Sequence, residues 1–335
     1  MQYQYIPNYT KPQIPLDKSN QEKKFIRFFS NRIGSAFLFG QIGVLIISVI
    51  LSVWLILIFG NKAKEIITGD YALLIEQIVL SILLFVPPFF IAKTSFKNYS
   101  KRLIHFKIRH KKYSALLFLV ALGFTAVSNI VTDIIATIFA MFNLTPMNFT
   151  LEIPHSVGGA ILFTLTLSVV PALIEEYALR GVTMGGLRNI GDKNALIISS
   201  LLFALMHSNF IQIPFALLMG LVLGYLTLVT GSILPAVLLH FINNFASSAV
   251  SLLNEFVGYN TAILVQWVYY GVFLMLGVLG YVLLRKNYET PFLKLKNDNL
   301  NLSSSSVIKT YFLTSPTTII ICVYFLGSAF YELFR

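Results

Sequence analysis

Charged residues are scarce in this chain, and their scarcity limits what kind of protein it can be. Only 12% of the 335 residues are charged, whereas 56% are hydrophobic, and the mean hydropathy is +0.76. A soluble domain usually carries about 25% charged residues. The composition therefore excludes a soluble globular protein, a disordered chain and a fibrous protein. It predicts an all-α polytopic membrane protein.

Cysteine is also nearly absent. Cys322 is the single cysteine and lies in an apolar run, which excludes an intrachain disulfide and a cysteine-rich metal site. Acidic residues are outnumbered, with 14 Asp and Glu against 25 Lys and Arg. In a soluble protein this balance would suggest nucleic acid. Here most basic residues fall in predicted loops on one side of a membrane, so we expect the lipid bilayer, and no nucleic acid, as their partner.

About nine apolar runs are candidate membrane spans, since about 20 residues cross about 30 Å of hydrocarbon. With a cytoplasmic N-terminus, only Lys62, Lys64 and Arg335 of the basic residues fall on the outer side, which predicts that orientation. A composition rich in Lys, Asn and Ile favours a bacterial plasma membrane. The fifth and sixth runs are short, so we expect eight to nine helices. The runs are roughly Gly34–Gly60, Ala72–Ala92, Ser114–Phe142, Val157–Met184, Ala195–His207, Pro214–Val229, Ile233–Val250, Thr261–Leu284 and Pro316–Phe334.

The runs and the polar stretches between them predict four parts. Residues 1–33 form a basic cytosolic tail, and 34–113 hold two membrane helices and a basic cytosolic loop. Residues 114–284 form a helical core, and 285–335 a cytosolic linker and a last helix. The last helix either spans the membrane or lies at its surface.

The fourth run carries three ionisable residues, although such groups are costly inside a bilayer and usually face a protein interior. Glu176 and Arg180 are four residues apart with the acid first, which is the favourable order for a helical ion pair. Glu175 points about 100° away around the helix. It is therefore a carboxylate without a local partner and is available for chemistry. The alternative is that both acids are structural.

Two histidines and an asparagine lie in later runs at a similar depth. His207 ends the fifth run, and His240 and Asn244 share one face of the seventh, with Asn243 as the weaker alternative. At about 1.5 Å per residue, Glu175, His207 and His240 lie about 14, 18 and 11 Å from the cytosolic edge. The bilayer midplane is at about 15 Å. Either histidine alone is more often a core residue, so the prediction depends on the whole set.

This set of side chains suits hydrolysis. Glu175 can take a proton from water that His207 orients, while His240 and Asn244 donate hydrogen bonds to the oxyanion. Alternatively, Glu175, His207 and His240 bind a divalent metal such as zinc, which leaves a position open for water. An ordinary zincin is excluded, because the sequence has no His-Glu-x-x-His helix. The residues leave both mechanisms open.

The three segments resemble the motifs of the intramembrane CAAX-protease and bacteriocin-processing family, also called the CPBP or ABI family. Its pattern is Glu-Glu-x-x-x-Arg, then Phe-x-x-x-His, then His-x-x-x-Asn. Each motif is weak alone, but three in order on separate apolar helices are specific. The resemblance covers about 157–250. The matching residues are Glu175, Glu176 and Arg180, then Phe203 and His207, then His240 and Asn244.

The resemblance implies an α-helical intramembrane endopeptidase that uses water as its nucleophile. In this family the first glutamate of the pair is the base, with the first histidine beside it. The second histidine and the asparagine form the oxyanion site. Those positions are Glu175, His207, His240 and Asn244 here, and supporting roles fall to Glu176, Arg180 and Phe203.

The expected substrate is a peptide or a membrane-protein segment, and the terminal segments are candidates for recruiting a membrane-protein partner. Eukaryotic relatives cleave prenylated CAAX proteins, and bacterial relatives are linked to bacteriocin immunity and peptide maturation. Two other functions compete with a protease. A non-proteolytic immunity or regulatory scaffold would keep its phenotype in a Glu175→Gln variant. A secondary transporter would take up ions into vesicles, but the sequence shows no internal repeat to support it.

Overall fold

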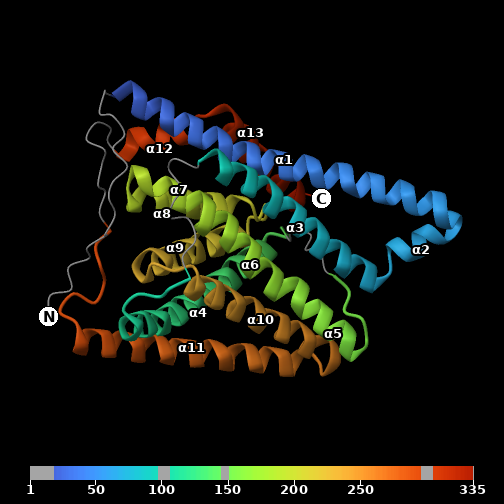
Figure 1. The fold of residues 1–335 in the computed structure, drawn as a ribbon. Coiled ribbons are helices and arrows are strands. Elements are labelled where there is room, and N and C mark those ends of the chain that lie inside the picture. The colour runs from blue at the N-terminus through green and yellow to red at the C-terminus, as the bar shows by residue number, and fades with distance from the viewer. Residues whose placement is uncertain (1–18, 97–105, 145–150, 296–304, 335) are drawn as a thin grey trace.

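Every secondary-structure element is a helix in the part of the chain that the structure, a computed structural model, describes (Figure 1). Eight candidate spans in this part are long and apolar enough to cross a membrane. The all-α polytopic membrane fold is therefore confirmed. The described residues are 19–96, 106–144, 151–295 and 305–334.

The helices fall into three groups along the chain. The first group is α1 (Ser19–Phe59), η1 (Gly60–Lys62), α2 (Ala63–Ile67), α3 (Asp70–Ser95) and α4 (Lys111–Met141). The second is α5 (Val157–Thr164), η2 (Leu165–Val169), α6 (Val170–Glu176), η3 (Tyr177–Met184), α7 (Gly185–Leu187), η4 (Arg188–Ile190), α8 (Asp192–Leu205) and α9 (Gln212–Thr230). The third is α10 (Leu234–Phe256), α11 (Tyr259–Asn287), α12 (Ser305–Leu313) and α13 (Pro316–Phe334). From α5 to α7 the chain forms one candidate span of 31 residues.

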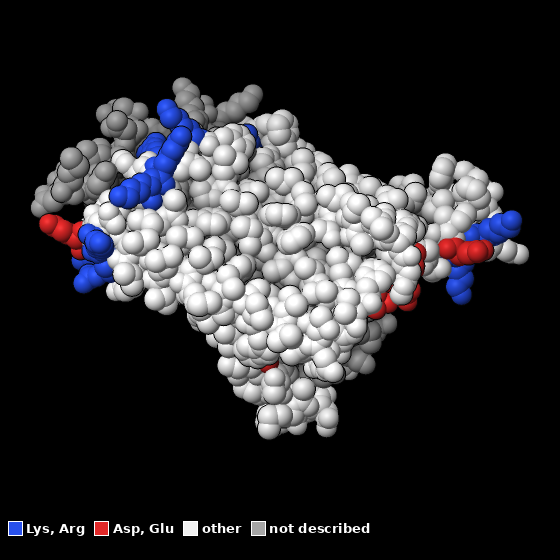
Figure 2. All heavy atoms as spheres, turned by 90° about the horizontal axis from the view of Figure 1, so that it is seen from below, with Lys and Arg blue, Asp and Glu red and all other residues white. Residues whose placement is uncertain are grey.

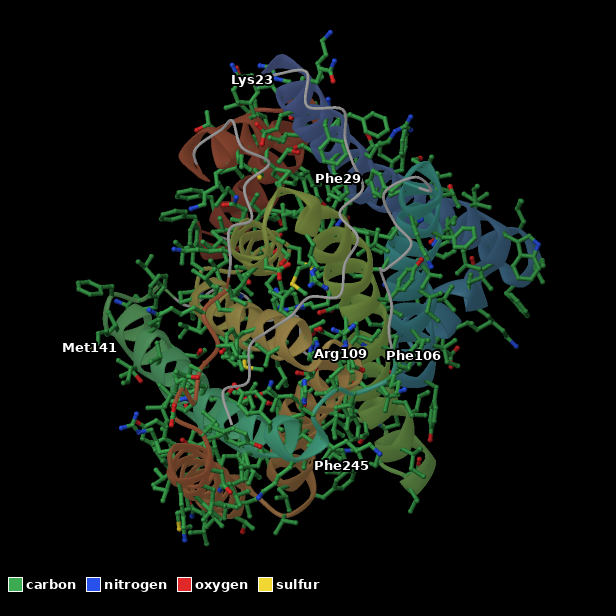
Figure 3. The ribbon with its side chains drawn as sticks, turned by 60° about the vertical axis from the view of Figure 1, so that its left-hand side comes forward. Lys23, Phe29, Phe106, Arg109, Met141 and Phe245 are labelled. Atoms are coloured by element: carbon green, nitrogen blue, oxygen red, sulfur yellow. The ribbon has the colours of Figure 1, made fainter. Side chains whose placement is uncertain are left out.

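The first helix begins earlier than the sequence predicted. Helix α1 starts at Ser19, and its Ile26, Phe29 and Ile33 are buried. Phe29 points into the bundle, where its ring lies against Gly186 of α7 (Figure 3). This part of the predicted tail is therefore a packed helix. Parts of the tail, the basic loop and the linker lie outside the described residues, namely 1–18, 97–105 and 296–304.

The last apolar run forms α13, which is long enough to span and packs along α1. The hydroxyls of Ser30 and Thr318 lie 2.6 Å apart, and Thr317 Oγ1 donates to Asn31 O at 3.0 Å. Both contacts join residues near the start of the chain to residues near its end. The C-terminal helix is therefore held against the first one.

The structure shortens the fifth predicted span. Helix α8 has 14 residues, so it is about 21 Å long and does not cross about 30 Å of hydrocarbon. It ends at Leu205, and Ser208 then takes a positive φ of 50°. Asn209 Oδ1 accepts from the N–H groups of Ile211 and Gln212, at 2.9 and 3.3 Å, which starts α9. The placement of His207 within a span was therefore wrong, because the chain turns back before the helix reaches it.

The bundle has two flanking sides, and the elements that carry the polar motifs, α6, η3, α8 and α10, lie between them (Figure 1). Helices α1, α3 and α13 pack together on one side, and α4 and α11 pack together on the other. Helix α11 approaches α4 closely, since a Cβ added to Gly123 would lie 2.8 Å from Gly277 Cα. Asp133 of α4 also accepts from Gln266 and Tyr270 of α11, at 3.0 Å each. Asp133 therefore joins α4 to α11.

Charged side chains are nearly absent from the middle of one outer face of the molecule. Figure 2 shows Lys, Arg, Asp and Glu gathered at two opposite ends of one face, with an almost uncharged band between them. Many large apolar side chains are exposed, such as Leu57, which is 79% exposed, and Met141, which points outward in Figure 3. An exposed apolar band of this kind suits contact with lipid.

Candidate active site

The helix that carries the two glutamates is irregular on both sides of them. Helix α6, which ends at Glu176, lies between the π-helical segments η2 and η3. Pro171 explains part of this, because it has no N–H to donate to the carbonyl of Leu167 four residues earlier. Such π-helical segments within α-helices are frequent at functional sites. The irregularity frees the Leu167 carbonyl for another donor.

Glu176 and Arg180 form the predicted ion pair. Arg180 Nη1 donates to Glu176 Oε1 at 2.7 Å, and neither side chain is exposed. Arg180 Nη2 also donates to Gly220 O of α9 at 3.3 Å, and the guanidinium lies 4.3 Å from the centre of the Phe203 ring. A buried charge pair needs such extra partners to offset its loss of water. The pair therefore ties η3 to α8 and α9.

His240 reaches both glutamates. Its Nδ1 lies 3.1 Å from Glu176 Oε1. Because the carboxylate of Glu176 accepts, we assign the hydrogen of the ring to Nδ1, which leaves Nε2 facing Glu175. The distance from His240 Nε2 to Glu175 Oε2 is 3.9 Å, too long for a direct hydrogen bond.

Glu175 differs from its neighbour in its surroundings. Its side chain is 17% exposed, and its buried Oε2 accepts no hydrogen bond from the part of the chain that the structure describes. The sequence predicted a carboxylate turned away from the ion pair, and the geometry agrees. Glu175 thus has an acceptor oxygen that none of the described residues uses.

His207 joins the group through Phe203. Its Nδ1 lies 2.7 Å from Phe203 O, and its ring meets the Phe203 ring edge-on at 5.0 Å. The His240 ring meets Phe203 at 5.8 Å. Phe203 therefore lies against both histidines. Nδ1 of His207 donates to the carbonyl oxygen of Phe203. Nε2 of His207 is therefore the ring atom left to act as an acceptor.

Asn244 belongs to a chain of amides. Its Nδ2 donates to Leu167 O at 3.2 Å, and its Oδ1 accepts from Asn243 Nδ2 at 3.1 Å. Asn129 Nδ2 of α4 donates to Asn243 Oδ1 at 2.9 Å. Sequence reasoning missed Asn129 and gave Asn243 only as an alternative to Asn244. A polar residue in the middle of an apolar helix is the signal that could have pointed to Asn129.

The alternative that the sequence left open is a metal site of Glu175, His207 and His240. Among the described residues no three His, Cys, Asp or Glu side chains are arranged to hold a metal ion. Glu175, His207 and His240 are all described, so the arrangement that the sequence left open is not assembled here. A divalent metal held by Glu175, His207 and His240 therefore stays a prediction from the sequence, and the steps below use protein groups.

The comparisons with known proteins agree with this geometry. Residues 157–246 match a family model described as type II CAAX prenyl endopeptidase, Rce1-like. This segment is similar to the Rce1-like family. A search of curated proteins and a search of solved structures each gave no match. The Rce1-like segment contains all seven motif residues, and it confirms the predicted family. At the level of the family, the activity is that of an intramembrane CAAX-type endopeptidase, and its substrate is a peptide or protein.

Proposed function

We propose that this protein is an intramembrane endopeptidase that hydrolyses a peptide bond in a membrane-associated peptide or protein. The observation that carries the proposal is the placement of Glu175. Its Oε2 accepts no hydrogen bond from the described residues and faces His240 Nε2 across 3.9 Å. Two groups at this separation can each hydrogen-bond one water placed between them.

Glu175 acts as the general base. It removes a proton from this water as the water oxygen bonds to the substrate carbonyl carbon. The same carboxyl then returns the proton to the leaving nitrogen as the C–N bond breaks. His207, with Nδ1 turned to the Phe203 carbonyl, presents Nε2 to orient the attacking water.

His240 and Asn244 stabilise the oxyanion. The amide nitrogen of Asn244 has two hydrogens, and only one of them is used on Leu167 O. The other is available to the oxyanion, and His240 Nε2 donates as well when its ring carries a second proton. Both residues project from the same face of α10, one turn apart.

The buried pair of Glu176 and Arg180 positions these groups. Glu176 Oε1 holds His240 Nδ1 at 3.1 Å, which orients the ring toward Glu175. Arg180 neutralises Glu176 and lies on the Phe203 ring. The division of roles between adjacent glutamates follows from their different directions around the helix.

We further propose that the protein lies in a bacterial plasma membrane with its N-terminus in the cytoplasm. The bias of basic residues toward one side supports this orientation. The proposed substrate is a peptide or a segment of a membrane protein.

The decisive experiment compares peptide termini in membranes and medium from cells with wild type or Glu175→Gln at matched expression. Glu76→Gln is the matched control, because Glu76 is another carboxylate in a candidate span but lies in α3 outside the motifs. We expect termini that wild type and the control produce and that Glu175→Gln does not. Purified protein should then cleave the peptide so identified, or a prenylated CAAX peptide. Identical termini, with a deletion phenotype rescued by Glu175→Gln, would instead indicate a non-proteolytic immunity or regulatory scaffold.

A further inference from the structure

We infer that Asn129 of α4 is a positioning residue for Asn244, acting through Asn243. This inference rests on the proposed function, in which Asn244 donates a hydrogen bond to the oxyanion. Three consecutive hydrogen bonds carry it, from Asn129 to Asn243 at 2.9 Å, from Asn243 to Asn244 at 3.1 Å and from Asn244 to Leu167 O at 3.2 Å.

The chain of amides has a fixed direction. Both hydrogens of Asn129 Nδ2 are engaged, one by Asn243 Oδ1 and one by Thr125 O of the same helix at 3.0 Å. The orientation of Asn129 therefore presents a donor to Asn243. Asn243 must then accept with its oxygen and donate with its nitrogen. Asn244 Oδ1 accepts from Asn243 Nδ2, so the NH₂ group of Asn244 points away from Asn243.

This direction matters for the proposed reaction. An oxyanion needs donors, so Asn244 must present nitrogen and not oxygen to the substrate. The carbonyl oxygen and the amide nitrogen of asparagine have nearly the same shape, and hydrogen bonding alone decides which one faces the substrate. In Asn244 the bond from Asn243 holds the oxygen, and the Leu167 carbonyl takes only one of the two hydrogens.

Burial limits the partners that these three amide side chains can bond. The side chain of Asn243 is buried, at 4% exposure, so water does not readily replace its partners. The hydrogen bonds also connect three elements, α4, α10 and η2. Polar networks in a low-dielectric interior depend on every member being satisfied. Losing Asn129 would therefore leave Asn243 Oδ1 without its donor and free both following amides to reorient.

The test is a double-mutant cycle on purified full-length protein, with the peptide that wild type is found to cleave. Asn129→Leu should lower kcat about tenfold or more with little change in KM, but by less than the roughly 10²- to 10³-fold loss expected from removing an oxyanion donor. In an Asn244→Ala background, Asn129→Leu should cause almost no further loss, because the two residues act through one donor. Asn129→Gln, which keeps an amide donor, should recover part of the activity.

Thr132→Val is the matched control. Thr132 lies one turn further along α4, and its hydroxyl donates to Ser128 O of the same helix, at 2.9 Å. Full activity is expected for this variant. Melting curves of each variant check folding, and where Asn129→Leu does not fold, Asn129→Ser replaces it in the cycle with a smaller expected loss.

Three outcomes would overturn the inference. An unchanged kcat in a folded Asn129→Leu variant would remove Asn129 from the site. Losses that multiply fully in the double variant would mean that Asn129 acts independently of Asn244. Full activity in Asn244→Ala would reject the proposed oxyanion role itself, and the inference with it, which separates failure of the inference alone from failure of the proposed function.

Discussion

Arg180 offers the sharpest test of how the site is built. Its side chain and that of Glu176 are both fully buried and joined at 2.7 Å. Arg180→Met replaces the guanidinium with an unbranched apolar side chain and so removes the charge. Glu176 Oε1 then keeps only His240 as a partner, and Glu176 Oε2 already has none among the described residues. The variant therefore leaves an uncompensated charge in an interior that excludes water.

The magnitude follows from that burial. Breaking a buried ion pair by removing one partner costs about 3–5 kcal/mol of folding free energy, because the other charge stays desolvated. An exposed i,i+4 pair contributes only about 0.3–0.5 kcal/mol. The double variant Glu176→Gln/Arg180→Met should regain most of the loss, since a neutral amide costs less to bury than a carboxylate.

The assay is denaturant unfolding of purified protein in micelles, followed by circular dichroism. Arg188→Met is the matched control, since Arg188 and Asp192 form another i,i+4 pair at 2.7 Å, with side chains 18% and 12% exposed. We expect a smaller loss of stability there than in Arg180→Met. Equal losses in both variants, or a double variant no more stable than Arg180→Met, would refute the reasoning from buried charge.

Three further predictions concern turnover and packing. His207→Ala should lose nearly all turnover while keeping its melting temperature, as measured by product formation and thermal unfolding. Asn244→Ala should lower kcat roughly 10²- to 10³-fold in steady-state kinetics, because one oxyanion donor is lost; a loss confined to KM would argue for substrate binding instead. Gly123→Leu should lower the free energy of unfolding by about 1–3 kcal/mol or more, since Gly277 leaves no room for it. Gly271→Leu, where a Cβ would meet nothing within 4 Å, should be nearly neutral in the same unfolding assay.

Much of the fold and the ion pair could be predicted because both depend on local periodicity. Long apolar runs identify membrane helices by length alone, and the spacing of Glu176 and Arg180 fixes their contact on any helix. The same rule correctly placed His240 and Asn244 on one face of α10. These predictions need no knowledge of how the helices pack.

The end of α8 could not be predicted in the same way. The apolar run continues through Leu205 and Met206, so hydropathy gives no sign that the helix stops. The stop depends on the positive φ of Ser208 and on Asn209 bonding the first N–H groups of α9. The start of α1 was missed for a different reason, because basic residues diluted an apolar face that repeats every three to four residues. That face, with Ile26, Phe29 and Ile33, was visible in the sequence.

The contact of Asn129 could not be predicted from local sequence patterns. Its contact with Asn243 joins residues 114 positions apart, on helices whose relative register no single helix encodes. A sequence can mark Asn129 as unusual in an apolar run, but only the packing of α4 against α10 gives it a partner.

The two adjacent glutamates illustrate how packing assigns chemistry to identical side chains. Glu176 turns toward Arg180 and His240 and is completely buried, so its charge is committed to holding those groups. Glu175 turns toward the opposite nitrogen of the same histidine and remains 17% exposed, with no hydrogen bond to Oε2 from the described residues. One imidazole thus lies between a carboxylate that fixes its orientation and one whose Oε2 accepts no hydrogen bond from the described residues. Exchanging the two positions is not possible without turning the helix by about 100°, which would move Arg180 as well. The two glutamates therefore have different roles. A substitution at Glu176 should mainly change folding, and a substitution at Glu175 should mainly change turnover.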